Sequence, residues 1–193
     1  FQDEQAVAPD PHSEVGQLLI AAGLCNDARL IPPNSETPQW TILGDPTEAA
    51  LLVVARKGQL DLQEITRQTP RLHELPFDSR RKRMSTVHQL TVGGQQSDIP
   101  YPQSLASELR QIVYVKGAPK EVLSLCTHLR LHGQTCALDD KQRARVITAN
   151  DNYARAGLRV LAIAQRVLSD TPQTWTPETV ERELTFLGLI AML

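Results

Sequence analysis

The sequence predicts an α/β (α+β) domain in which helices flank a largely antiparallel sheet. Stretches with apolar residues at helical spacing alternate with stretches rich in β-branched residues along the 193 residues, and there is no internal repeat. Several predicted strands are separated by loops too short for a crossover helix, which favours antiparallel pairing. The apolar content of 41% is enough for one well-packed core.

Helices are expected where a capping residue precedes apolar positions at helical spacing. Residues 13–24 form the first helix, with Ser13 as the N-cap. In residues 45–58, Asp45 is the expected N-cap and Pro46 takes the first helical position. The remaining helices are expected at residues 61–68, 119–126 and 139–156.

Strands are expected where β-branched and aliphatic residues gather between turn signals. The stretch "THLRLHGQTCAL", residues 127–138, predicts a hairpin that turns at "HGQ". The polar, proline-containing stretches 31–39 and 93–104 are predicted loops. The other strands are expected at residues 40–43, 71–77, 84–92, 111–115, 158–167 and 184–193.

The chain is expected to hold one domain, residues 13–193, preceded by a tail or linker of residues 1–12. It starts without methionine and stops inside the apolar "LTFLGLIAML", which we interpret as a segment cut from a longer protein. The longest apolar runs are well short of the roughly 20 residues that a membrane-spanning helix needs. This segment is therefore expected to make no direct membrane contact.

Composition and motifs exclude several classes of function. The formal net charge of −2 lacks the strongly basic balance of a nucleic-acid-binding protein. The phosphate loop GxxxxGK[ST], the dinucleotide signature GxGxxG, and the HExxH and GxSxG motifs are all absent from the sequence. We therefore predict no catalytic residue in this segment. The three cysteines form no CxxC pair, which fits reduced thiols in a cytosolic setting.

Four residues of metal-ligating type fall close together: Cys126, His128, His132 and Cys136. Their spacing does not match a standard zinc finger. The predicted hairpin would also scatter these side chains over both of its faces. We predict no metal site.

Lys116 and Glu48 are each open to two interpretations. In "YVKGAP", Lys116 ends a strand and precedes a helix, so it could hold an anion or be a surface lysine before a proline-started helix. Glu48 is the third residue after Asp45, so its carboxylate could complete a capping box or serve a ligand.

The stretch "LPFDSRRKRMS" combines one aromatic residue with a basic run of four cations, Arg80 to Arg83. Phe77 could offer its ring to a planar heterocycle while Lys82 supplies charge, a combination that suits a nucleotide. The alternative is a non-catalytic interaction module that binds an acidic protein or a nucleic acid through residues 80–83. Phosphorylation of Ser85 is a further hypothesis, although a strand position would limit access to its hydroxyl.

Taken together and in this order, "CNDA", "GDPTEAAL", "LPFDSRRKRMS", "YVKGAP" and "GLRVLAIA" resemble the nucleotide-binding (N) domain of a type II P-type cation-transporting ATPase, the branch that includes calcium pumps and sodium/potassium pumps. The resemblance runs from about residue 13 to the last residue. It implies a domain on the cytoplasmic side of a membrane that binds ATP, as Mg-ATP in the whole pump. Its implied partners are the phosphorylation and actuator domains of the same polypeptide.

The resemblance implies roles for seven residues. Glu48 would approach the adenine, Phe77 would stack on its ring, and Lys82 would line the pocket. Lys116 would lie deep in the cavity, and Gly117 would let the base approach closely. Arg159 would reach toward the ribose and phosphates, and Leu161, two residues along the same strand face, would pack against the ring.

Two departures bear on the phosphates. Calcium pumps often carry an arginine two positions after the stacking phenylalanine, where this sequence has Ser79. The "DKTGT" segment, whose aspartate accepts the γ-phosphoryl group, does not occur in these residues. The resemblance therefore implies binding without hydrolysis by this segment alone. We expect an affinity of about 0.1 to 1 mM, mainly from stacking and a few polar contacts.

Overall fold

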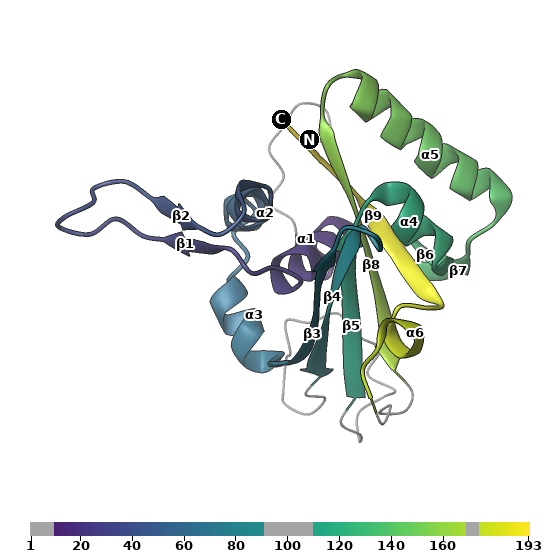
Figure 1. Ribbon diagram of the computed structural model, residues 1–193, viewed down its shortest axis with the longest axis horizontal. Coiled ribbons are helices and arrows are strands. Elements are labelled where there is room, and N and C mark those ends of the chain that lie inside the picture. The colour runs from purple at the N-terminus through teal and green to yellow at the C-terminus, as the bar shows by residue number, and fades with distance from the viewer. Residues whose placement is uncertain (1–9, 91–109, 169–173) are drawn as a thin grey trace.

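The computed structural model describes residues 10–90, 110–168 and 174–193 (Figure 1). Most of the expected tail 1–12, the end of the strand expected at 84–92 and the loop expected at 93–104 lie outside the described residues. Within them, a seven-stranded sheet runs in the order β3-β4-β5-β8-β9-β6-β7. Every neighbouring pair is antiparallel except β6 and β9, so the prediction of a largely antiparallel sheet is confirmed.

The strands of this sheet are longer at its centre than at the β7 edge. Their bounds are β3 Arg71–Asp78, β4 Arg83–Leu90, β5 Arg110–Gly117, β6 Cys126–Leu131, β7 Gln134–Ala137, β8 Arg159–Leu168 and β9 Leu184–Met192. The expected hairpin is β6–β7, whose turn residues His132 and Gly133 both have positive φ. The helix expected at 119–126 ends at Ser124, because Cys126 already pairs in the sheet.

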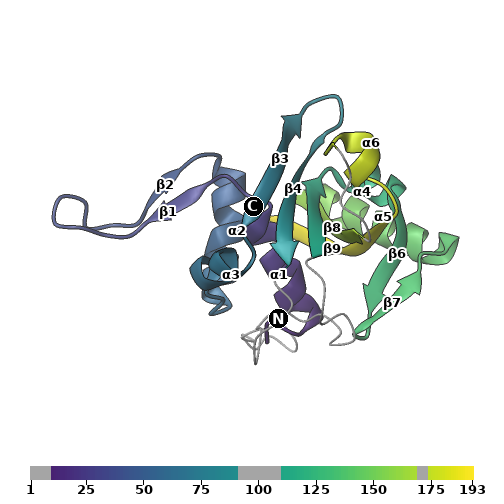
Figure 2. The ribbon, with the colours of Figure 1, turned by 90° about the horizontal axis from the view of Figure 1, so that it is seen from below.

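Helices cover both faces of the sheet (Figures 1 and 2). The helices α1 (Glu14–Leu24), α2 (Pro46–Lys57) and α3 (Leu62–Gln68) pack on one face, and α4 (Pro119–Ser124), α5 (Asp140–Arg155) and α6 (Pro177–Val180) on the other. Strand β5 shows the consequence, because Ile112 and Tyr114 join the first core while Val113 and Val115 join the second. Burial on both faces explains why "QIVYV" is almost continuously apolar.

Side-chain caps fix the helix starts that the sequence predicts. Ser13 Oγ accepts a hydrogen bond from the Gly16 N–H at 3.0 Å, and Asp45 Oδ1 accepts one from the Thr47 N–H at 2.7 Å. Each bond satisfies an N–H group that the helix itself leaves unpaired. No helix in the described part of the chain is long and apolar enough to cross a membrane.

Two short elements were not expected from the sequence. Strand β1 (Arg29–Ile31) pairs in a separate antiparallel ribbon with β2 (Thr41–Leu43), which is the strand expected at 40–43. The four-residue helix α6 lies between the strands expected at 158–167 and 184–193. Both views show the β1–β2 ribbon extending away from the main sheet beside α2 (Figures 1 and 2). The ribbon matters for the site because it begins immediately after the turn that contacts Glu48.

Candidate functional site

The structure pairs Lys116 with Glu48 across 68 residues of sequence. Lys116 lies near the end of β5, and its side chain is only 6% exposed. Its Nζ lies 2.8 Å from Oε1 of Glu48, in the first turn of α2. A buried ammonium group requires such a partner, because leaving it unpaired costs several kcal/mol.

The other oxygen of the Glu48 carboxylate is held by backbone. Oε2 accepts hydrogen bonds from the N–H groups of Asp27 at 2.8 Å and Ala28 at 3.2 Å. The side-chain amide of Asn26 donates to the Glu48 carbonyl at 2.8 Å. Asp45 therefore caps α2 without a reciprocal bond from Glu48, and the capping-box alternative for Glu48 is wrong.

Strand register surrounds Lys116 with apolar side chains on its face of the sheet. Lys116 is opposite Met84 on β4 and Ile163 on β8. Leu161, two residues before Ile163, is on the same face and packs partly buried against this core. Cys25 is buried in the same core, and burial raises the pKa of its thiol to about 11, so the thiol is protonated at neutral pH.

Gly117 has a packing role in the structure. It pairs with Arg83 on β4, and a Cβ atom at this position would lie 2.5 Å from both the Arg83 Cβ and the Lys82 carbonyl oxygen. The absence of a side chain therefore lets the β3–β4 turn approach the end of β5. The Ala118 N–H donates to the Lys82 carbonyl at 2.9 Å, and this hydrogen bond holds the β3–β4 turn against the end of β5.

Phe77 lies near the end of β3 and is 65% exposed. The register shifts between Leu75 and Asp78, so that Asp78 is opposite Arg83. Pro76 and Phe77 therefore both lie opposite the single residue Met84, whose partner on β5 is Lys116. The register shift thus places an exposed aromatic residue on the edge strand, level with the buried ion pair.

Much of the basic run is engaged inside the domain. Arg81 and Arg83 both form ion pairs with Glu181, whose side chain is fully buried. Lys82 lies 2.8 Å from Glu121 and is more than half exposed, so it does not contact the Glu48 carboxylate. The hydrogen bond from Lys82 lowers the pKa of Glu121. These pairs weaken the interaction-module alternative, because they engage three of the four cations with two carboxylates inside the domain.

Ser85, the candidate phosphorylation site, is fully buried and donates its hydroxyl to Glu181 at 2.5 Å. A kinase would have to expose this strand to reach it.

Arg159, at the start of β8, is exposed and donates to the hydroxyl of Thr47, the residue before Glu48. This contact places the Arg159 side chain beside the N-terminus of α2.

The predicted residues are thus brought together to different degrees. Glu48 and Lys116 are in direct contact, and Arg159 reaches their vicinity through Thr47. Leu161 shares the face of Lys116 and Phe77 lies in the bulge opposite Met84, whereas Lys82 is directed to Glu121. Sequence reasoning assigned no role to Asn26, although the "CNDA" motif that contains it was one of the signals of resemblance.

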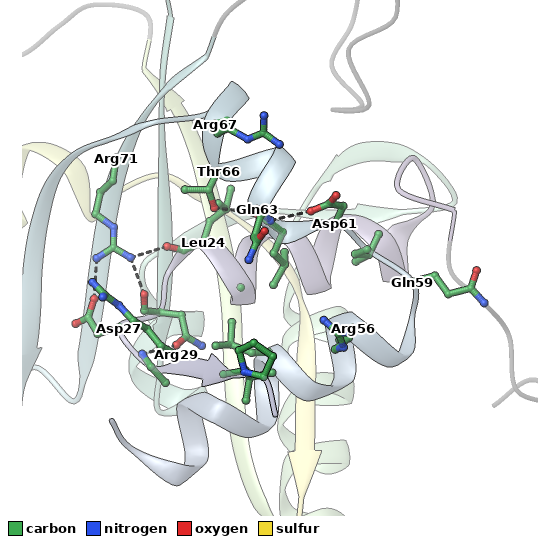
Figure 3. Close-up of a pocket in the computed structure, with 18 of the residues that line it drawn as sticks. Leu24, Asp27, Arg29, Arg56, Gln59, Asp61, Gln63, Thr66, Arg67 and Arg71 are labelled. Carbon is green, nitrogen blue, oxygen red and sulfur yellow. Dashed lines mark hydrogen bonds and ion pairs between the residues drawn. The ribbon is translucent and has the colours of Figure 1, made fainter. Parts of the chain in front are cut away.

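A hollow of about 1280 Å³ borders the turn that binds Glu48, because Asn26, Asp27 and Ala28 are among the residues that line it (Figure 3). Its lining comes mainly from α1, β1, α2 and α3 and includes Trp40, Arg56, Asp61 and Arg71. The Arg56 guanidinium lies 4.3 Å from the centre of the Trp40 ring. None of the seven residues predicted for the nucleotide lines it.

Comparison with known proteins agrees with the resemblance seen in the sequence. A family model described as "P-type ATPase, cytoplasmic domain N" matches residues 14–193. Calcium-transporting ATPase 1 of Lactococcus lactis is 32% identical over 176 residues, and probable cation-transporting ATPase F of Mycobacterium tuberculosis is 30% identical over 191. Sodium/potassium exporting P-type ATPase cta3 of Schizosaccharomyces pombe is 28% identical over 184 residues.

These alignments cover 91%, 98% and 94% of this chain but only 17%, 19% and 16% of the respective relatives. The chain therefore spans less than a fifth of the length of the pumps that it matches. The names of these relatives differ in the ion, while the family is shared. On the family match, this chain belongs to the P-type ATPases and corresponds to their cytoplasmic domain N.

Proposed function

We propose that this domain binds ATP by its adenine end, at a site formed by Glu48, Phe77, Lys116 and Arg159. The observation that carries the proposal is the buried Lys116–Glu48 pair with the exposed Phe77 ring two strands away, in the bulge opposite Met84. In the whole protein, the domain would deliver the γ-phosphate to an aspartate of a separate phosphorylation domain.

The chemistry of these groups suits adenine. Its exocyclic amine donates hydrogen bonds and its ring nitrogens accept them, so a carboxylate and an ammonium group side by side can serve both. The exposed ring of Phe77 offers a stacking surface, and such stacking is worth about 1–3 kcal/mol per base. Leu161 adds apolar surface on the face of Lys116, and Gly117 lets the β3–β4 turn pack against the end of β5 beside Lys116.

Charge near the phosphates would come from Arg159 and Lys82. Arg159 is exposed beside the N-terminus of α2, and Lys82 is more than half exposed and pairs with Glu121. Neither cation is buried in a closed phosphate cradle, which supports a weak affinity of about 0.1 to 1 mM. Weak binding suits a domain that must deliver ATP and then move away.

We further propose that residues 13–193 act as one nucleotide-binding domain of a cation-transporting ATPase, on the cytoplasmic side of its membrane. The partners would be the phosphorylation and actuator domains of the same polypeptide. The transported ion would be selected by membrane helices outside this segment.

The test is an NMR titration of the domain with ATP, with and without Mg²⁺. Amide shifts should cluster at Glu48, Phe77, Lys116 and Arg159 and saturate in the submillimolar to millimolar range. An acidic peptide should leave these residues unchanged. Shifts confined to residues 80–83, or no shifts at several millimolar ATP, would contradict the proposed function.

A further inference from the structure

We propose that Arg71 is a positioning residue of the nucleotide site, although it contacts neither Glu48 nor Lys116. It would act through the turn between α1 and β1, residues 24–28, by fixing the peptide groups that orient the Glu48 carboxylate. This inference rests on the proposed function, because it assigns the orientation of a residue that the proposal places at the adenine.

The guanidinium of Arg71 holds the turn from one side (Figure 3). Its Nη2 donates to the carbonyl oxygens of Leu24 at 3.0 Å and Asn26 at 2.6 Å. Its Nη1 donates to Asp27 Oδ1 at 2.7 Å and to Glu74 Oε2 at 2.8 Å. A planar group with several fixed N–H donors can make all four contacts at once, which the single ammonium of a lysine cannot reproduce.

Glu48 holds the same turn from the other side. The carbonyl of Asn26 and the N–H of Asp27 belong to one peptide group, and in a planar trans peptide these two bonds point in opposite directions. The carbonyl end binds Arg71 at 2.6 Å, and the N–H end donates to Glu48 Oε2 at 2.8 Å. A single rigid unit therefore connects the guanidinium to the carboxylate.

The side chain of Asn26 reinforces this connection between the turn and Glu48. The side-chain oxygen of Asn26 accepts from the Ala28 N–H at 2.9 Å, and its amide nitrogen donates to the Glu48 carbonyl at 2.8 Å. Asn26 is itself buried, so these bonds have little competition from water. Removing Arg71 would release the carbonyl side of the turn and let the N–H groups turn away from Glu48.

The experiment compares ATP binding and the state of Glu48 in the wild-type domain and in Arg71→Lys. We expect the Kd for ATP to rise about tenfold, together with a change in the side-chain carboxyl ¹³C shift of Glu48 in the ATP-free domain. The matched control is Arg67→Ala, which removes an exposed arginine that pairs with Glu64. It should leave both readouts unchanged.

A purely structural role for Arg71 would lower the melting temperature without changing the Kd or the Glu48 carboxyl shift measured far below that temperature. That result would overturn the inference. If Arg71→Lys does not fold, Asp27→Ala removes one anchor of the guanidinium and keeps the backbone N–H. It should raise the Kd about threefold, and an unchanged Kd would also overturn the inference.

The two proposals fail differently. If the wild-type domain binds no ATP, the proposed function fails. If the wild type binds and Arg71→Lys binds equally well with an unmoved Glu48 signal, only the positioning role of Arg71 fails.

Discussion

The Oε2 atom of Glu181 lies 2.7 Å from Nε of Arg83, although 98 residues separate them in the sequence. The same carboxylate binds Arg81 and accepts a hydrogen bond from Ser85, and its side chain is fully buried. Two arginines of the "RRKR" run, Arg81 and Arg83, thus hold the start of β4 against the residue that follows α6.

Substitution Glu181→Gln should destabilise the fold strongly. It removes the negative charge and leaves two partly buried arginines without a counter-ion, at an expected cost of about 3 kcal/mol in the free energy of unfolding. Urea denaturation measures this cost. The control Glu183→Gln disrupts the more exposed pair with Arg166 and should cost less than about 1 kcal/mol. Equal effects of the two variants would contradict the structural role of Glu181.

Substitution Phe77→Ala should weaken ATP binding without weakening the fold. Loss of stacking should cost about 1–3 kcal/mol of binding free energy, measurable by titration of the domain. Because the ring is 65% exposed, the free energy of unfolding should change by no more than about 0.5 kcal/mol. The control Tyr153→Ala removes an exposed ring on α5 and should leave ATP affinity unchanged. Wild-type affinity in Phe77→Ala would exclude stacking.

The Glu48–Lys116 pair should behave as one energetic unit. A double-mutant cycle with Glu48→Gln and Lys116→Met, followed by denaturation, should give an interaction energy of about 1–3 kcal/mol. The same cycle on the exposed Glu64–Arg67 pair should give no more than about 0.5 kcal/mol. If the Glu48 and Lys116 effects simply add, the pair is not coupled in the folded domain.

Substitution Gly117→Ala should destabilise the domain even without nucleotide. The added methyl group would collide with the Arg83 Cβ and the Lys82 carbonyl, and relief of that overlap should cost about 1–3 kcal/mol of unfolding free energy. Gly188→Ala is the control on β9, because its nearest neighbour would be the flexible Leu18 side chain at 3.1 Å. A melting temperature equal to wild type in Gly117→Ala would show that the β3–β4 turn is not packed as described.

The stability of the domain should fall as the pH is lowered below 6.5. Burial, with a contribution from nearby Arg71, lowers the pKa of His88 from 6.5 to about 4. Between these values the unfolded chain takes up a proton that the folded domain does not, so about 3 kcal/mol of stability is lost from pH 6.5 to 4. Denaturation at pH 7, 5.5 and 4.5 measures this loss. His88→Gln should flatten the profile, and an equally steep profile in that variant would assign the loss to other groups.

Sequence reasoning succeeded where the determining contact is local. Ser13 and Asp45 cap helices through N–H groups two or three residues away, so their roles can be inferred from a few letters. The three-residue β1 and the four-residue α6 are too short to show a periodicity, and both were missed. The capping-box alternative for Glu48 was open because sequence does not show that its carboxylate reaches residues twenty positions earlier.

Resemblance to a family named the residues of the candidate site, but it did not give their partners. That Lys82 contacts Glu121 and that Arg83 contacts Glu181 depends on how β4 packs against segments much later in the chain. The position of Phe77 depends on a register shift in β3. Pro76, directly before Phe77, is a local signal for such a bulge on an edge strand because proline cannot donate to the ladder, but this signal was not used. The Lys82–Glu121 and Arg83–Glu181 pairs join residues far apart in sequence, so only the three-dimensional structure could identify them.

The strand order of the main sheet sets a sequence of events for folding. Strand β9 lies between β8 and β6, so the β6–β7 hairpin joins the rest of the sheet only through the last strand of the described chain. During synthesis, the strands β3, β4, β5 and β8 can pair first. The β6–β7 hairpin can join them only after β9 has left the ribosome. Insertion of β9 is therefore the step that completes the sheet, and a ribosome-stalled chain lacking β9 should remain sensitive to proteases at β6–β7.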